Sequence, residues 1–175
     1  MNKKQKNLTN KGFSLVELII VIAIMAILAG ALAPALISYV AKSRRSTTVS
    51  NAQTIASGVT AALSDEAAFD AATAAFSAAG VASATPLQIS AQTISGNDFW
   101  EKVDENVSGG LASYSSLKAT KTSKKGTANP NKPIDSSAGY YMFVDTATSS
   151  VEISIKLTDG TYVQVYPNAT DDMTK

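Results

Sequence analysis

The polar and apolar positions of the 175-residue chain change character after residue 12 and again after residue 37. Residues 1–12 are polar and carry four lysines, whereas only Ser14 and Glu17 are strongly polar among the 25 residues 13–37. A helix of that length spans roughly 37 Å, more than the ~30 Å hydrocarbon core of a bilayer. The pattern therefore predicts a helix that crosses a membrane.

A secretory signal peptide shares the basic start and the apolar stretch, but its apolar region is about 7–15 residues long. Residues 18–37 form a run of 20 without a polar side chain, although residues 31–33 imitate a cleavage site. A spanning anchor is therefore favoured over cleaved secretion. The leading lysines predict a cytoplasmic N-terminus, and Lys42, Arg44 and Arg45 on the far side partly balance them.

Residues 38–63 are expected to continue the helix outward with a narrow apolar stripe. Apolar residues recur there at spacings of three and four, which is typical of one buried helical face. They are Val49, Ala52, Ala56, Val59 and Leu63. Such a stripe needs a partner, most simply a sheet of the same chain, and two heptads are too short to argue a coiled coil.

Residues 64–139 form an Ala-rich, variable region with two signals for short helices. Ser64-Asp65-Glu66 predicts a helix start with a capping hydroxyl and acids in its first turn. Asp98 with Glu101 resembles a capping box for a second short helix. Residues 81–97 are expected to form a short strand or a loop. The residues expected to face the core are Phe99, Val103 and Val107, with Trp100 packed beside them.

Residues 118–132 form a basic loop by composition, with five lysines, Gly126, Pro130 and no acidic residue. The lysines are Lys118, Lys121, Lys124, Lys125 and Lys132. Such a loop could attract DNA, an anionic glycan or another surface. No aromatic residue is interleaved to stack on bases, so the nucleic-acid signal is weak. A solvated loop is the simpler interpretation, and binding by these lysines is the alternative.

Residues 140–167 predict an antiparallel sheet with strands at 140–145, 151–157 and 161–166. A three-residue loop at 158–160, rather than a two-residue one, would pair the apolar positions of the last two strands. We expect this loop, with Gly160 in the left-handed conformation of a bulged turn. The expected pairs are Ile155 opposite Val163 and Ile153 opposite Val165. The long helix laid on this sheet gives an α+β fold, followed by a tail at 168–175.

Composition excludes several kinds of chemistry. The chain has no Cys and no His, so it can form no disulfide, no Cys/His zinc site and no Cys–His or Ser–His nucleophile system. No constellation of residues favours an enzyme, and no cofactor is expected.

The segment Gly12-Phe13-Ser14-Leu15-Val16-Glu17 resembles the type IV prepilin signature. It stands after a short lysine-rich leader and before the apolar run, and Pro34 lies in that run as in many pilins. The resemblance covers roughly residues 1–63 and implies a class III leader, residues 1–12, on a subunit with a pilin-like fold. Many Gram-negative pilins clamp their last loop with a disulfide, so the lack of cysteine suggests a Gram-positive source.

The resemblance implies that prepilin peptidase cuts the Gly12–Phe13 bond on the cytoplasmic side and N-methylates Phe13. Glu17 would then neutralise the N-terminal amine of a neighbouring subunit, because a buried carboxylate needs such a counter-charge. Cleavage removes four of the 15 basic side chains, so 11 remain against 14 acidic ones and the net charge changes from +1 to −3.

Gly30 and Pro34 weaken the same helical turn. Pro34 lacks the N–H that would bond to the carbonyl of Gly30, and glycine favours a helix by about 1 kcal/mol less than alanine. In this family the equivalent stretch is extended in filaments. We therefore expect a kinked or melted turn between the two residues after assembly, with a gentle kink of no functional role as the alternative.

We therefore expect a structural subunit of a type IV pilus that contacts membrane lipid first and is then assembled into a homo-oligomeric helical filament. A membrane platform and its assembly ATPase would move it from the cytoplasmic membrane to the cell surface. One alternative is a pseudopilin of a type II secretion or DNA-uptake (competence) machine. Another is a single-pass membrane protein with an outer ligand-binding domain. Cell adhesion, movement and DNA uptake stay open as uses of the filament.

Overall fold

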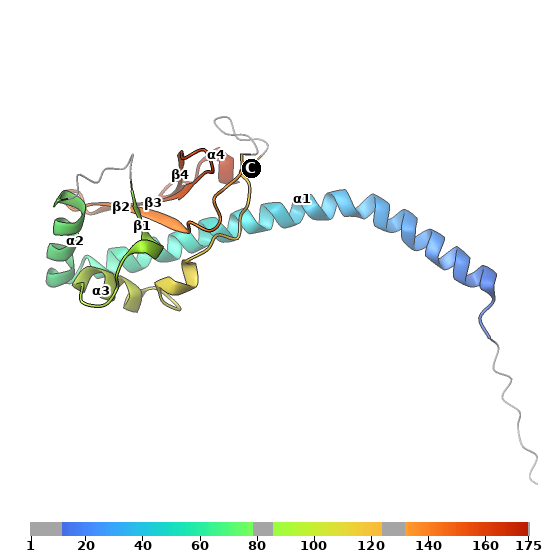
Figure 1. Cartoon of the computed structure of the whole chain (residues 1–175), viewed down its shortest axis with the longest axis horizontal. Coiled ribbons are helices and arrows are strands. Elements are labelled where there is room, and N and C mark those ends of the chain that lie inside the picture. The colour runs from blue at the N-terminus through green and yellow to red at the C-terminus, as the bar shows by residue number, and fades with distance from the viewer. Residues whose placement is uncertain (1–11, 79–85, 124–131, 175) are drawn as a thin grey trace, which may run out of the picture. The chain divides into compact units, whose positions relative to one another are not determined.

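The computed structural model describes residues 12–78, 86–123 and 132–174. The chain divides into two units, Met1–Tyr39 and Val40–Lys175. One helix, α1, spans Leu15–Ala62 and contributes residues to both units (Figure 1). The long N-terminal helix predicted from the sequence is therefore present, as a single element of 48 residues.

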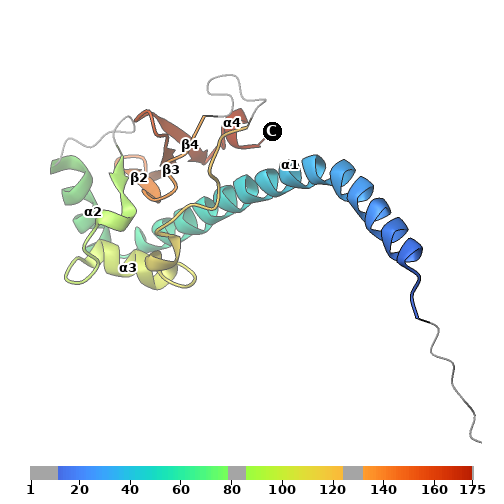
Figure 2. The same ribbon diagram turned by 45° about the vertical axis from the view of Figure 1, so that its right-hand side comes forward.

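The sheet of the second unit has four antiparallel strands in the order β1-β2-β3-β4. Three of them, β2, β3 and β4, are labelled in Figure 2. The strands are β1 (Leu87–Gln88), β2 (Tyr140–Asp145), β3 (Ser150–Lys156) and β4 (Tyr162–Tyr166). The sequence predicted three strands, and that number is wrong. The fourth is β1, which lies in the segment where a short strand or a loop was expected. A two-residue strand leaves almost no periodicity to detect.

The register between β3 and β4 agrees with the prediction at one end and departs from it at the other. Ile155 pairs with Val163, and Gly160 has φ +90°, as the three-residue loop requires. Ile153, however, pairs with Tyr166 rather than Val165, because the register shifts between Ile153 and Ser154. Such a bulge adds one residue to a strand and bends it.

The C-terminal segment folds back over β4. The Thr170 N–H donates to the Gln164 carbonyl at 3.3 Å. The short helix α4 (Asp171–Thr174) follows, and its Met173 is only 2% exposed.

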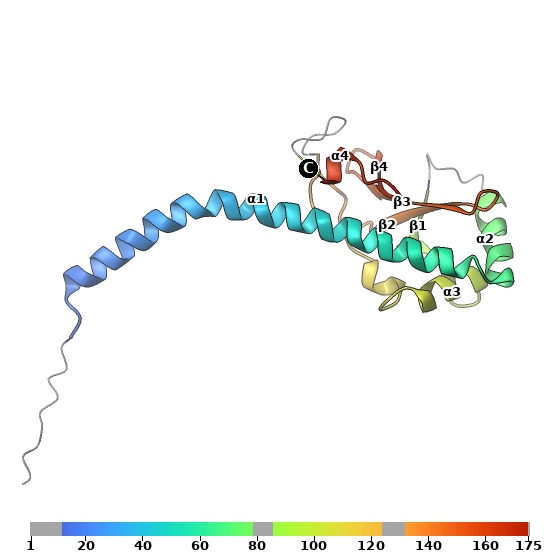
Figure 3. The same cartoon turned by 180° about the vertical axis from the view of Figure 1, so that it is seen from behind.

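Two further helices, α2 (Glu66–Ala78) and α3 (Asp98–Asn106), pack together in the second unit beside the C-terminal part of α1 (Figure 3). Short helical turns lie at η1 (Ile89–Ala91) and η2 (Leu111–Tyr114). The chain makes a turn after α1, so α2 is a separate helix rather than a bent continuation, two alternatives that the sequence left open.

The N-caps of α2 and α3 differ from the predicted ones by one residue. For α2, the Asp65 carboxylate accepts the Ala68 N–H at 3.1 Å, and the expected Ser64 hydroxyl does not cap the helix. For α3, Asn97 rather than Asp98 is the cap and accepts the Trp100 N–H at 3.1 Å. Asn97 has an extended backbone, which allows its side chain to reach into the first turn.

The core fills the space between α1, the inner face of the sheet and α3. The part of α1 in the second unit buries a broader face than predicted, because Ile55 and Ala62 join the expected stripe while Val49 and Leu63 lie at its margin. Phe99, Val103 and Val107 are buried as predicted, and Trp100 is 2% exposed and so packs in the core. Phe76 of α2 meets the Phe99 ring edge-on at 5.9 Å.

A buried polar junction connects α1 to β2 and to the start of the basic loop. The Thr48 hydroxyl donates to the Arg44 carbonyl at 3.1 Å and accepts the Ala119 N–H at 3.2 Å. The Tyr140 hydroxyl donates to the Thr48 carbonyl at 3.0 Å. Both Thr48 and Tyr140 are fully buried, so these bonds satisfy groups that would be costly to leave unpaired.

Candidate functional site

The Gly12–Phe13 bond lies in non-helical, exposed backbone. Residues 12–14 precede α1, which begins at Leu15, and the Phe13 side chain is 91% exposed. A Cβ added at Gly12 would meet no atom within 4 Å. The backbone here is therefore open to an enzyme, and its carbonyl is not tied into a helix. The remaining leader residues, 1–11, lie outside the described part of the chain.

Ser14 and Glu17 form a capping box at the start of α1. The Ser14 hydroxyl accepts the Val16 N–H at 3.3 Å, and the Glu17 Oε2 accepts the Ser14 N–H at 2.8 Å. This reciprocal arrangement satisfies donors that a helix start leaves unpaired. The box fixes the N-terminal start of α1 at Leu15, so that Phe13 and Ser14 lie between the Gly12–Phe13 bond and the helix. It was not identified from the sequence, although Ser-x-x-Glu before an apolar run is its known signature.

The first part of α1 exposes an apolar surface on all its sides. Its large apolar side chains between Leu15 and Val40 keep 38–73% of their surface exposed. Burying one such side chain fully is worth about 1.5–3 kcal/mol. By length and composition α1 can cross a membrane, and none of its most apolar stretch is buried in the structure. This surface therefore requires a bilayer or other apolar helices around it.

Gly30 and Pro34 both lie inside α1 in the isolated chain. A Cβ at Gly30 would meet no atom within 4 Å, so nothing in the described chain requires a glycine there for space. The expected opening of this turn concerns the assembled filament and stays a prediction.

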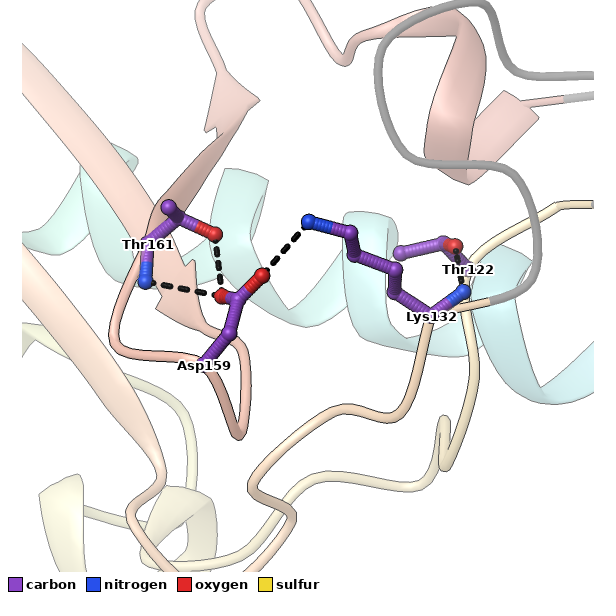
Figure 4. Close-up of polar contacts among 4 residues, drawn as sticks. All are labelled: Thr122, Lys132, Asp159 and Thr161. Atoms are coloured by element: carbon purple, nitrogen blue, oxygen red, sulfur yellow. Dashed lines mark hydrogen bonds and ion pairs between the residues drawn. The ribbon is translucent and has the colours of Figure 1, made fainter.

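The five lysines of the basic loop differ in exposure and in their contacts. Lys118 and Lys121 are exposed, whereas Lys124 and Lys125 lie outside the described residues. Lys132 is bound: its Nζ contacts the Asp159 carboxylate at 2.5 Å, and its backbone N–H donates to the Thr122 hydroxyl at 2.8 Å (Figure 4). The base of the loop is thus attached to the β3–β4 turn.

The Lys132 ammonium and the Thr161 hydroxyl and N–H hold the pKa of Asp159 well below its ordinary value. Thr161 donates to the same carboxylate, with its N–H at 3.0 Å. Asp159 therefore stays ionised over the physiological range. Because the pair is exposed, its contribution to stability is small, and its effect is to hold the turn against the loop.

Metal chemistry finds no support in the parts of the chain that the structure describes. Within residues 12–78, 86–123 and 132–174, no three His, Cys, Asp or Glu side chains gather in a group that could hold an ion.

One comparison with known proteins gives a match. A family model described as the prokaryotic N-terminal methylation motif matches residues 8–33, which include Gly12, Phe13, Glu17 and Gly30. Comparisons with curated proteins and with solved structures find no match. The predicted resemblance to the type IV prepilin leader is confirmed, with a long apolar helix behind it. The motif indicates a pilin-like prepilin that is processed by prepilin peptidase and anchored in a membrane.

Proposed function

We propose that this chain is a structural subunit of a type IV pilus. It enters the cytoplasmic membrane as a prepilin, is cleaved after Gly12, becomes N-methylated at Phe13 and polymerises through α1. A membrane platform and an assembly ATPase then place it in a filament on the cell surface. The observation that carries the proposal is the open Gly12–Phe13 bond followed directly by a capped, unpartnered apolar helix.

Cleavage after Gly12 is supported by the backbone around the bond. A peptidase must reach the carbonyl carbon of the bond that it cuts, and a helical carbonyl is occupied by the N–H four residues later. The Ser14–Glu17 box keeps the helix from extending back over this bond. The new N-terminus would be a cationic amine only four residues before Glu17.

Glu17 has a different partner at each stage of this proposal. Before cleavage its carboxylate accepts the Ser14 N–H, which offsets part of the cost of placing an acid near hydrocarbon. After cleavage an amine is available as a full counter-charge. In the filament the amine of a neighbouring subunit would take that place, because subunits that gain this pair bury both charges together.

Polymerisation is supported by the surface that α1 leaves uncovered. Its apolar side chains cannot be satisfied by water, and the described chain offers nothing to cover them. A bilayer covers them before assembly. Neighbouring copies of α1 cover them afterwards, so a subunit can leave the membrane without exposing them.

The test is mass spectrometry of filaments sheared from the cells that make this protein, together with electron microscopy. The expected mature chain begins at a methylated Phe13. A Gly12→Val variant should stay uncleaved and enter no filament, whereas Gly30→Ala should still be cleaved; in both cases the added Cβ meets no atom within 4 Å, so the fold is undisturbed. An intact leader on the wild-type protein would contradict the proposal. Cleaved subunits without surface filaments would favour the pseudopilin alternative.

A further inference from the structure

The charges of the outer domain are segregated along the chain. Residues 40–63 carry three basic side chains and no acidic one, and residues 118–132 carry five basic side chains and no acidic one. Between them, residues 64–117 carry seven acidic side chains and one basic one. Residues 133–175 are mixed, with six acidic and two basic side chains. Opposite charges are thus carried by different parts of the chain, and the fold decides which of these parts lie close together.

The fold brings the two basic blocks to the same level of α1. The Ala119 N–H donates to the Thr48 hydroxyl at 3.2 Å, so the segment around residue 119 runs beside the α1 turn that contains Thr48 (Figure 1). The exposed members of this set are Lys42 and Arg44 of α1 with Lys118 and Lys121 of the segment. We call these four residues the basic surface.

The acidic block lies at the other end of the same part of α1. Asp65 lies three residues after the end of α1, and its charge acts on Lys102 of α3. Gly58, in the last turns of α1, faces Val107 at the C-terminal end of α3. From Thr48 to Ala62 the helix rises about 21 Å at 1.5 Å per residue. The two charged ends are therefore separated along α1 by about four helical turns.

Some acidic side chains in this block accept hydrogen bonds from the backbone, and others do not. Asp65, Glu101 and Asp104 accept backbone N–H groups at helix starts and at the turn after α3. The remaining exposed ones take no part in these bonds. They are Glu66 and Asp70 of α2 with Asp98 and Glu105 of α3, and we call them the acidic surface. Glu105 pairs with Lys102 at 3.2 Å, with both side chains largely in solvent.

We propose that the acidic surface of one copy of this chain binds the basic surface of the next copy. The inference rests on the proposed function and names a contact within the filament. At physiological ionic strength exposed charges more than about 8 Å apart are screened, so the two surfaces of one copy cannot satisfy each other. A second copy can bring them into contact. Two different, complementary surfaces on one chain form a head-to-tail interface, which generates a ring or an open helical filament.

The contact supplies direction and register rather than most of the binding energy. Each exposed ion pair is worth about 0.2–1 kcal/mol. Several such pairs together therefore change the affinity between two subunits by a few factors of ten at most. The apolar helices contribute more to the affinity between subunits, but beyond Glu17 their apolar part, residues 18–41, carries no charge that could select a stagger. Opposite charges at the two ends of the outer domain select the stagger in which unlike ends meet, and they disfavour the stagger in which like ends meet.

The test reverses charges in the full-length protein when it is the only copy in the cells that make it. The first variant, Lys118→Glu/Lys121→Glu, reverses two of the four charges of the basic surface and so brings its net charge from +4 to zero. The second, Asp70→Lys/Glu105→Lys, brings the net charge of the acidic surface from −4 to zero in the same way and leaves the capping residues in place. The swap variant carries all four changes and has the net charge of the wild type. The matched controls Lys118→Arg/Lys121→Arg and Asp70→Glu/Glu105→Asp keep every charge. Filaments are measured by immunoblot of the sheared fraction, and cleaved subunit in the membrane is measured beside it.

We expect each reversed variant alone to lose at least tenfold of the filament yield while its cleaved subunit persists in the membrane. The swap variant should recover at least half of the wild-type yield, and co-expression of the two reversed variants should give filaments that contain both. The controls should assemble normally. A swap variant that stays as low as the lysine variant overturns the proposal and indicates that the lysines serve an anionic membrane or DNA. Wild-type yield from either reversed variant overturns it as well, with the pilus assignment intact. Absence of any wild-type filament removes the pilus assignment and this contact together.

Discussion

Raising the pH should destabilise the outer domain through one tyrosine, Tyr140. Its ring is fully buried and its hydroxyl donates to the Thr48 carbonyl at 3.0 Å. Burial raises the pKa of Tyr140 from 10.0 to about 12. Because the folded pKa lies above the unfolded one, the contribution of this group is fully present below pH 10. It is lost as the pH rises from about 10 through 12.

The magnitude follows from the shift of two pKa units, from 10.0 to about 12. Each unit corresponds to 1.36 kcal/mol, so the neutral phenol stabilises the folded state by roughly 2–3 kcal/mol relative to the phenolate. Tyr140→Phe removes the titration but also removes one buried hydrogen bond, which is worth about 1 kcal/mol. At pH 7 the variant should therefore be less stable than the wild type by about 1 kcal/mol. Near pH 12 it should be the more stable of the two.

The assay is chemical unfolding of the full chain in detergent micelles, followed by circular dichroism at intervals from pH 7 to pH 12. Tyr162→Phe, which removes a half-exposed phenol, serves as the control and should not produce a crossing. If the wild type and Tyr140→Phe lose stability in parallel up to pH 12, the burial of this phenol is not what the alkaline transition reports. That result would refute the reasoning.

Three further changes test other contacts. Gly58→Ala places a Cβ in steric overlap with Val107 Cγ2. The cost of this overpacking, about 1–3 kcal/mol, should outweigh the ~1 kcal/mol gain in helix propensity. The melting temperature of the variant should therefore fall. A Val107→Ala background should restore part of the loss, and a rise in the single variant would show that α3 shifts freely. Lys132→Met should weaken the domain at pH 6 and by a smaller amount at pH 3, because the lowered pKa of Asp159 gives stability that is fully present above pH 4 and is lost as the pH falls from there through the folded pKa; equal urea midpoints at pH 6 would contradict this. Ser14→Ala should speed amide exchange at Val16 about fivefold through loss of a cap worth ~1 kcal/mol, while Ser14→Asp should not.

The fold was predictable where local pattern and tertiary structure agree. The alternation from Val151 to Leu157 located β3 and its buried face, and the three-residue loop with Gly160 located the β4 hairpin. The bulge opposite Ile153 was not predictable, because the residues of β4 alternate regularly through Val163 and Val165 and nothing in them indicates an extra residue.

The candidate site likewise contains residues that the sequence predicted and residues that it missed. Gly12, Phe13 and Glu17 follow from a spacing that is specific enough to recognise, and the matched family model includes all three. The capping role of Ser14 was readable from Ser-x-x-Glu, but the resemblance drew attention to the glutamate alone. The N-caps of α2 and α3 were missed by one residue because neighbouring Ser, Asp and Asn compete for the same role and only backbone conformation decides.

Contacts between residues far apart in the sequence carried no signal at all. Lys132 and Asp159 are 27 residues apart, and nothing in either segment indicates that they pair. The same holds for Thr48 and Tyr140, which are 92 residues apart. Without Cys there is no disulfide to suggest a connection, so these polar junctions are visible only once the chain is folded.

The C-terminal segment that returns over β4 also covers part of an edge of the sheet. β4 is the last strand of the sheet, and an open strand edge is a template for β-aggregation. The bond from Thr170 to Gln164 and the buried Met173 occupy that edge, and the opposite edge is a strand of only two residues. If the chain assembles through α1 and its charged surfaces as proposed, the sheet would add no competing route of edge-to-edge association, because one edge is partly covered and the other is short.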